Sequence, residues 1–379
     1  GDAAHRAQLA EQWDGADVVV TSYDLLRRDE TLYENQKFYA CILDEAQAIK
    51  NHTTQKYKAV CGVNSRVRFA LTGTPVENRL GELWSIFSFL MPGYLPPYKS
   101  FCSRFEKPIV QEEDQTAVRR LNQLTGPFIL RRMKSDVLKE LPPKTENVYR
   151  IELEEEQRKL YLAAVVDARE KLRAAKPEDK MAVFAVLMRL REICCDPRLI
   201  ADNWTGGSAK LDACIELVTS AVESGHRILL FSQFTSMLEL LAKRLDAEGV
   251  SHFTLQGSTP KPVRAELVRR FNGGEASVFL ISLRAGGTGL NLTAADIVIH
   301  YDPWWNVAAQ NQATDRAYRI GQQNPVQVYK LIAQDTIEEK IVELQQAKQD
   351  LAETVTGSAD GAILRMKPEE LLNLLEGTE

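Results

Sequence analysis

The sequence predicts an α/β protein with two parallel sheets. Short apolar runs rich in Val, Ile and Leu alternate with helical patterns, as they do where parallel strands are covered by helices on both faces. This alternation occurs twice, near the start of the chain and again from residue 227 onward. The middle, 81–226, lacks it and contains helical patterns interrupted by prolines. A chain of 379 residues is also long enough for two or three domains.

The elements can be assigned in chain order from these patterns. Strands are predicted at Asp17–Tyr23, Phe38–Leu43, Val67–Leu71, Arg227–Phe234, His252–Gln256, Val278–Leu283, Ile297–Tyr301 and Val326–Ile332. Helices are predicted at Gly81–Leu90, Thr116–Leu124, Glu154–Ala175, Lys180–Cys194, Ser236–Glu248 and Pro262–Phe271. Strands that alternate with helices form parallel sheets, because each crossover returns the chain to the same end of the sheet.

These elements predict four parts of the chain. Residues 1–140 form the first lobe with a helical insertion, 141–204 a helical linker, 205–335 the second lobe, and 336–379 a bracing helix and tail. Thr336 and Glu339 form a capping-box pattern at the start of that helix. Ile337, Ile341, Leu344 and Leu351 mark its apolar face. We expect the helix to pack back onto the lobes, because the stripe is short for the alternative, a free coiled coil.

Composition and charge exclude several classes of protein. Hydrophobic residues make up 44% of the chain and charged residues 26%, the balance of a globular protein. No apolar run approaches the ~18–20 residues that span a membrane, so we expect a cytoplasmic protein without a membrane partner. The six cysteines form no CxxC pair, and Cys194 and Cys195 are expected to be buried thiols. The net charge of −5 gives no general sign of nucleic-acid binding, but phosphate contacts need only a local basic groove.

An acidic pair follows the predicted strand Phe38–Leu43. Ligands bind at the carboxyl ends of parallel strands, which is where Asp44 and Glu45 stand. Asp44 could hold a magnesium ion through water, and Glu45 could accept a proton from an attacking water. Alone, such a pair is more often a solvated turn.

Small and hydroxyl residues follow the next strand. Thr72, Gly73 and Thr74 would let the backbone pass close to phosphates or to the acidic pair. As a bare string they could form a simple turn.

Two further strings lie near the end of the second α/β region. The Gly-rich stretch 282–291, with Gly287 and Gly289, suggests a backbone cradle or a flexible turn. Arg316 and Arg319 are three residues apart, so on a helix they would share a face and could clamp a phosphoryl group. A salt-bridged surface helix is the alternative for this pair.

Taken in order, these strings resemble motifs II to VI of superfamily-two helicase-like ATPases, and specifically the bacterial type of the SWI/SNF-like branch. The resemblance covers nearly the whole chain. The strings that carry it are DEAQAIKN (44–51), LTGTPVEN (71–78), FILRRMKSD (128–136), ILLFSQF (228–234), LQGST (255–259), SLRAGGTGLNL (282–292), YDPWWN (301–306) and QATDRAYRIGQ (312–322).

The resemblance implies two RecA-like lobes that use ATP and Mg²⁺. It makes Asp44 the magnesium residue, Glu45 the water-activating residue, and Arg316 and Arg319 the residues that reach the γ-phosphate. The nucleotide-associated positions that it implies are Thr72, Gly73, Thr74, Gly287, Gly289 and Gln312.

The resemblance also implies a surface for double-stranded DNA. The positions that it assigns to DNA contact are Thr21, Ser22, Tyr23, Ser232, Gln233, Arg284 and Trp305. Arg131, Arg132 and Lys134 form a basic cluster that could add phosphate contacts or be a solvated face.

The main departure of the chain from the family is a missing phosphate-binding loop. Members carry a GxGKT loop that cradles the β- and γ-phosphates, and no GxxxxGK[ST] string occurs in this chain. Gly206 to Lys210 only superficially resembles such a loop, and we expect it to open a helix. We therefore expect an N-terminally truncated fragment with an incomplete first lobe, which hydrolyses ATP poorly on its own.

Three functions remain open at this point. The first is a DNA-stimulated ATPase that moves along duplex DNA and remodels protein–DNA complexes. The second is a lobe pair that binds nucleic acid or polymerase without chemistry, which the missing loop suggests and the intact Glu45, Arg316 and Arg319 oppose. The third is a motor that acts on RNA or on RNA polymerase complexes.

Overall fold

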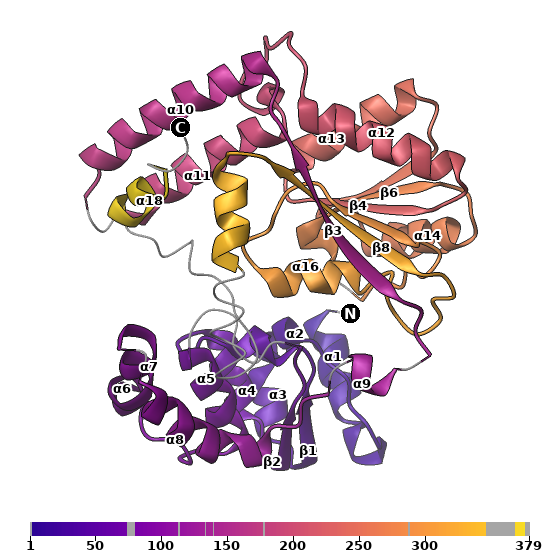
Figure 1. Ribbon diagram of the computed structural model, residues 1–379. Helices are drawn as coiled ribbons and strands as arrows, with labels where there is room; N and C mark the ends of the chain where they lie inside the picture. The colour runs from indigo at the N-terminus through magenta and orange to yellow at the C-terminus, as the bar shows by residue number, and fades with distance from the viewer. Residues whose placement is uncertain are drawn as a thin grey trace. The chain divides into compact units, whose positions relative to one another are not determined.

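The computed structural model describes residues 2–73, 80–112, 114–132, 134–138, 140–176, 179–286, 289–345 and 368–375 (Figure 1). One compact unit contains the described residues up to Leu130, and a second contains those from Arg131 onward. Within the described ranges, no helix is both long and apolar enough to cross a membrane.

The first unit contains a two-stranded parallel sheet and a helical part. Strand β1 (Phe38–Leu43) pairs with β2 (Ser65–Ala70), with Leu43 opposite Ala70. Both strands were predicted. The helical elements before and between them are α1 (Ala3–Ala10), η1 (Trp13–Gly15), α2 (Tyr23–Arg28), α3 (Glu30–Glu34), η2 (Ala46–Ile49) and α4 (Gln55–Gly62).

A string of helices follows the two strands. They are α5 (Leu80–Leu90), α6 (Tyr98–Phe101), the π-helical turn η3 (Cys102–Glu106), α7 (Lys107–Gln111), α8 (Gln115–Thr125) and η4 (Gly126–Phe128). Helix α5 is apolar on most of its surface, because it serves two cores. Phe89 packs with Ile49 and Val60 beside the sheet, and Phe87 packs with Phe101 of the helical part.

The prediction of a strand at Asp17–Tyr23 is wrong. Residues 18–22 form no strand, and helix α2 begins at Tyr23. Ser22 caps this helix, because its Oγ accepts a hydrogen bond from the Leu25 amide at 3.3 Å. Val18 and Val20 are 76% and 90% exposed. A strand needs a hydrogen-bonded neighbour, and among the described residues of this unit β1 and β2 pair only with each other.

The second unit is built on a six-stranded parallel sheet with the order β3-β8-β7-β4-β6-β5. The strands are β3 (Lys144–Ile151), β4 (Ile228–Ser232), β5 (His252–Leu255), β6 (Val278–Ser282), β7 (Ile297–His300) and β8 (Val326–Ala333). Strands β4 to β8 match the predicted segments. The helices connecting them are α12 (Ala209–Glu223), α13 (Thr235–Ala247), α14 (Lys261–Asn272), α15 (Leu283–Gly286) and α16 (Val307–Thr314).

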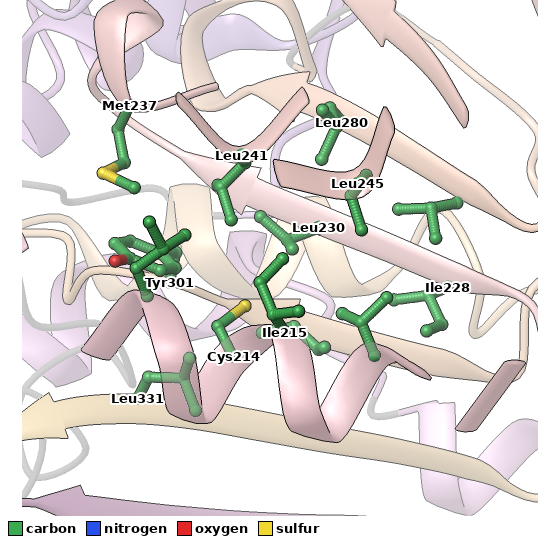
Figure 2. Close-up of a cluster of buried hydrophobic side chains, with 14 of the residues drawn as sticks. Cys214, Ile215, Ile228, Leu230, Met237, Leu241, Leu245, Leu280, Tyr301 and Leu331 are labelled. Carbon is green, nitrogen blue, oxygen red and sulfur yellow. The ribbon is translucent and has the colours of Figure 1, made fainter. Parts of the chain in front are cut away.

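Helices cover both faces of this sheet, and the side chains of β4 show how. Ile228 and Leu230 pack with α12 and α13 on one face, as Figure 2 shows with Ile215, Leu241 and Leu245. Leu229 and Phe231 point to the other face, in a cluster with residues of α14 and α16. Because successive side chains alternate between faces, a continuous apolar run is what a strand covered on both faces requires.

Strand β3 was not predicted. Its residues KTENVYRI are exposed except for Ile151, so the sequence carries no apolar pattern there. The strand forms at the sheet edge because its backbone pairs with β8 along its whole length, from Lys144 opposite Val326 to Ile151 opposite Ala333. Ion pairs from Lys144 and Lys330 to Glu146, each 2.7 Å, add to this pairing.

A helical bundle completes the second unit. The predicted helices are present as α10 (Glu155–Ala174) and α11 (Lys180–Cys195), and α18 (Pro368–Leu375) packs against both. The tail helix, described over 337–345, buries Ile337 and Ile341 in the same core. Its predicted face residue Leu351 lies outside the described residues. The remaining elements are α9 (Lys134–Val137) and η5 (Pro197–Leu199).

His300 at the end of β7 predicts a pH-dependent stability. Burial lowers its pKa to about 3, its Nε2 lies 2.8 Å from Thr314 Oγ1, and its ring stacks on Phe231. Below about pH 6.5 the unfolded chain binds a proton that the folded chain refuses, so stability falls as the pH drops toward 3. Between about pH 7 and about pH 4 we expect wild type to lose about 3 kcal/mol more than a His300→Gln variant, measured by urea unfolding.

The exposed His5 provides the control, because His5→Gln should keep the pH slope of wild type. Equal slopes for wild type and His300→Gln would contradict the prediction.

Candidate functional site

The acidic pair lies at the carboxyl edge of the first unit's sheet. Asp44 and Glu45 follow directly after β1, and both are exposed. Asp44 Oδ1 accepts a hydrogen bond from the Glu45 amide at 3.0 Å. Glu45 has the left-handed backbone angles φ 49° and ψ 53°, which cost a residue with a Cβ about 1–3 kcal/mol. Such strain is often found at functional sites, where the surrounding structure maintains it.

A hydrogen-bond chain joins this pair to Thr72, two residues after the end of β2. Glu45 Oε2 accepts from Gln47 Nε2 at 2.6 Å, and Gln47 Oε1 accepts from the Thr72 hydroxyl at 2.7 Å. The backbones meet as well, since the Ala46 amide donates to Leu71 O at 2.9 Å. The structure therefore brings Glu45 and Thr72 together through Gln47, which the sequence reasoning did not select. Its place as the last letter of the DEAQ string was the available signal.

The neighbouring predicted residues are only partly described. Gly73 is exposed and follows Thr72, and Thr74 lies outside the described residues. The carboxylate of Asp44 fits a magnesium ion, because Mg²⁺ prefers carboxylate oxygens and retains several waters, which an exposed site permits.

The segment Thr21 to Tyr23 is tied to the acidic loop. Tyr33 donates to Thr21 Oγ1 at 2.8 Å, and Tyr23 donates from its hydroxyl to Asp44 O at 2.7 Å. Burial, with a smaller contribution from the charge of Asp44, raises the pKa of Tyr23 to about 12. With Ser22 capping α2, the polar side chains of this segment all make hydrogen bonds within the first unit.

In the second unit, the Gly-rich stretch begins with a helical turn. Strand β6 leads into α15, and Ser282 Oγ accepts from the Ala285 amide at 3.3 Å. Gly289 has φ +31°, a conformation that favours glycine. Gly287 lies outside the described residues, and the structure does not describe the Arg284 side chain.

Arg316 and Arg319 do not lie on one face of a helix, contrary to the prediction from their spacing. Helix α16, which contains Gln312, ends at Thr314, and consecutive turns follow up to Gly321, which has φ +101°. Arg316 is 7% exposed, while Arg319 is exposed. Because Leu292 donates its amide to Arg316 O at 3.0 Å, the turns bring Arg316 beside the end of the Gly-rich stretch.

Ser232 and Gln233 contact a residue that was not predicted, Asp302, and Trp305 lies against its ion-pair partner Arg191. The Ser232 hydroxyl and the Gln233 amide donate to Asp302 Oδ1 at 2.6 and 3.2 Å. Ser232 is fully buried, and Trp305 is 6% exposed beneath the Arg191 guanidinium. The aspartate of the YDPWWN string was the sequence signal for this residue.

The basic cluster divides into two kinds of residue. Arg131 and Arg132 are exposed. Lys134 forms an ion pair of 2.6 Å with Asp315 and donates to Tyr318 O at 3.2 Å. Lys134 thus contacts the turns that contain Arg316 and Arg319.

Comparison with known proteins identifies the family. The model of the SNF2-related domain matches residues 2–199, and that of the helicase conserved C-terminal domain matches residues 209–321. A putative ATP-dependent helicase/translocase of Bacillus subtilis is 40% identical over 97% of this chain, and an uncharacterized ATP-dependent helicase of Mycoplasma genitalium is 37% identical over 99%. The chain spans 41% and 36% of the lengths of these two relatives.

Solved structures agree with the fold class predicted from the sequence. The Sulfolobus solfataricus SWI2/SNF2 ATPase core in complex with double-stranded DNA has 34% identity and a TM-score of 0.53, over 96% of this chain and 77% of that one. The core domain solved on its own has 35% identity and a TM-score of 0.54, over 96% and 75%. With its parallel sheets flanked by helices and both conserved domains matched, the chain belongs to the SNF2-related family of helicase-like ATPases.

Proposed function

We propose that this chain is part of an ATP-driven motor that moves along double-stranded DNA and remodels protein–DNA complexes. The observation that carries the proposal is the chain of hydrogen bonds from Glu45 through Gln47 to Thr72. It holds a carboxylate at the carboxyl edge of a parallel sheet, where α/β proteins bind ligands. It also connects Thr72, through Gln47, to the carboxylate of Glu45.

Each residue has a separate role in the proposed hydrolysis. Asp44 would hold Mg²⁺, which when bound neutralises charge on the β- and γ-phosphates. Glu45 would orient the attacking water and accept its proton. Arg316 and Arg319 would stabilise the charge that develops on the transferred phosphoryl group. Gln312, Gly287, Gly289, Gly73 and Thr74 would line the nucleotide.

The proposed substrate is duplex DNA, which one structurally similar protein binds in its solved complex. Arg131 and Arg132, both exposed, are the proposed phosphate contacts, and such contacts carry no sequence information. The test compares duplex DNA, single-stranded DNA and duplex RNA as stimulators of ATP hydrolysis by the whole gene product. Duplex DNA should stimulate most. Strongest stimulation by duplex RNA would favour the RNA-directed motor, and clean strand displacement would contradict translocation without unwinding.

The 379-residue chain on its own should hydrolyse ATP poorly. No GxxxxGK[ST] string occurs in it, so it lacks the backbone amides and lysine that cradle the β- and γ-phosphates in this class of enzyme. A phosphate-release assay on this chain, with the whole gene product beside it as the control, measures the difference. Comparable turnover by both would overturn the expectation.

A second candidate function is a binding module without chemistry, and the same missing string favours it. Replacing Glu45 in the whole gene product distinguishes the two candidates. A motor would lose its ATP hydrolysis, whereas a binding module has no hydrolysis to lose.

A further inference from the structure

A buried polar network joins two of the second unit's candidate DNA-contact residues, Ser232 and Trp305. Its centre is Asp302, which is fully buried and follows β7. Asp302 Oδ1 accepts from the Ser232 hydroxyl at 2.6 Å and from the Gln233 amide at 3.2 Å. Ser232 Oγ also accepts from the Phe234 amide at 3.2 Å. The turn after β4 is therefore held by side chains as well as by the sheet.

The charge that balances Asp302 comes from the helical bundle. Arg191, on α11, is fully buried, and its Nη2 donates to Asp302 Oδ2 at 3.1 Å and to Pro303 O at 2.5 Å. Its Nε and Nη1 have no hydrogen-bond partner within the part of the chain that the structure describes. The guanidinium instead lies over aromatic rings, 4.3 Å from the Trp305 centroid and 5.6 Å from that of Phe234. Cation–π attraction is strongest at such desolvated sites.

One arginine thus touches two segments that are far apart in the sequence. Through Asp302 and Phe234 it reaches the turn 232–234, and through Pro303 and Trp305 it reaches the segment 302–305. A buried ion pair adds little net stability compared with apolar side chains of the same volume. Its directional hydrogen bonds do fix the geometry of whatever they join.

We propose that Arg191 and Asp302 are positioning residues that hold the turn 232–234 and the segment 302–305 in the geometry that binds duplex DNA. This inference rests on the proposed function. It gives Ser232 and Trp305 a different role from direct DNA contact, because both are buried and engaged with Asp302 or Arg191. It also links α11 of the helical bundle mechanically to the DNA-binding turn.

The test uses three replacements in the whole gene product: Ser232→Ala, Asp302→Asn and Arg191→Met. The matched controls are Ser236→Ala, an exposed serine on α13, and Arg189→Met on the same helix as Arg191. Arg191→Lys keeps the charge but lacks the planar fork, so it should restore function only in part.

Two measurements decide the outcome. Hydrogen–deuterium exchange should show the amides of Gln233 and Phe234 exchanging about tenfold faster in the three variants, because each variant loses a hydrogen bond of the network that holds the turn. The duplex-DNA concentration that half-saturates ATP hydrolysis should rise about tenfold, while hydrolysis without DNA and the KM for ATP stay at wild-type values. The controls should match wild type in both.

Unchanged exchange and unchanged half-saturation, with only a lower melting temperature, would overturn the proposal and leave the network a purely structural feature. Ser232→Ala keeps the test decisive if an Arg191 variant fails to fold, because it removes a single hydroxyl. Failure of the proposed function would look different, since wild type itself would then show no stimulation by duplex DNA. The exchange of the Gln233 and Phe234 amides would still decide whether the network holds the turn.

Discussion

Replacing Arg316 by glutamine in the whole gene product is expected to lower the maximal rate of ATP hydrolysis about a thousandfold. A guanidinium that reaches the transferred phosphoryl group stabilises charge in the transition state, which a neutral amide cannot do. Arg316→Lys should also be severely impaired, because an ammonium lacks the planar fork that binds phosphate oxygens in pairs. Binding of duplex DNA should change little in either variant.

Arg316 is 7% exposed, so its replacement could also disturb packing. A thermal melt separates the two effects, because a catalytic role predicts loss of hydrolysis at a nearly unchanged melting temperature. Arg269→Gln is the matched control, since Arg269 is a surface residue paired with Glu266 at 2.6 Å. Near-normal hydrolysis by Arg316→Gln would remove Arg316 from the proposed chemistry.

Replacing Lys210 by methionine is expected to destabilise the second unit by about 3–5 kcal/mol. Lys210 and Glu338 are both fully buried and form an ion pair, and Glu338 Oε2 also accepts from the Ala333 amide at 2.8 Å. Burial already raises the pKa of Glu338, and Lys210 opposes that rise. Without Lys210, a carboxylate in a low-dielectric interior must lose its charge or draw in water, and both cost free energy.

The free energy of unfolding in urea measures this effect. The double variant Lys210→Met with Glu338→Gln should recover much of the loss, because the amide oxygen can still accept from Ala333 without burying a charge. Lys243→Met, on the exposed side of α13, should change stability by less than about 0.5 kcal/mol. If Lys210→Met lowers the free energy of unfolding by less than about 1 kcal/mol, Lys210 is not the counter-charge that stabilises the buried Glu338.

The sequence predicted the elements whose apolar pattern is strong. Strands β4, β6, β7 and β8 lie inside a sheet covered on both faces. Every side chain of β4, β6 and β7 is buried, so the apolar run of each strand is continuous. Helices α10 and α11 were found because their apolar residues recur at helical spacing. The opening of α12 after Ser208 was also predicted, and there the helix buries Lys210.

The errors arose where tertiary context decides. Residues 17–23 have a strand-like composition, but no described strand pairs with them. Strand β3 has an exposed, polar sequence and depends on its pairing with β8. The spacing of Arg316 and Arg319 suggested one helix face, and the end of α16 at Thr314 placed them in turns instead.

The candidate site was predicted unevenly for the same reason. Asp44, Glu45 and Thr72 could be placed from the ends of strands, because parallel strands bring their carboxyl ends to one edge. Gln47, Asp302 and Arg191 could not be assigned a role, since what matters is which atoms they join across 25, 70 and 111 residues of sequence. Burial of Ser232 and Trp305 likewise depends on packing that motif strings do not encode.

The most direct test of the account is the rate of ATP hydrolysis by the whole gene product, with and without duplex DNA, beside a Glu45→Gln variant. The account predicts strong stimulation by duplex DNA in wild type and its loss in the variant, because the amide cannot accept a proton from the attacking water. Wild-type hydrolysis that is absent under every condition, or that is equal in the variant, would contradict a motor that uses Glu45.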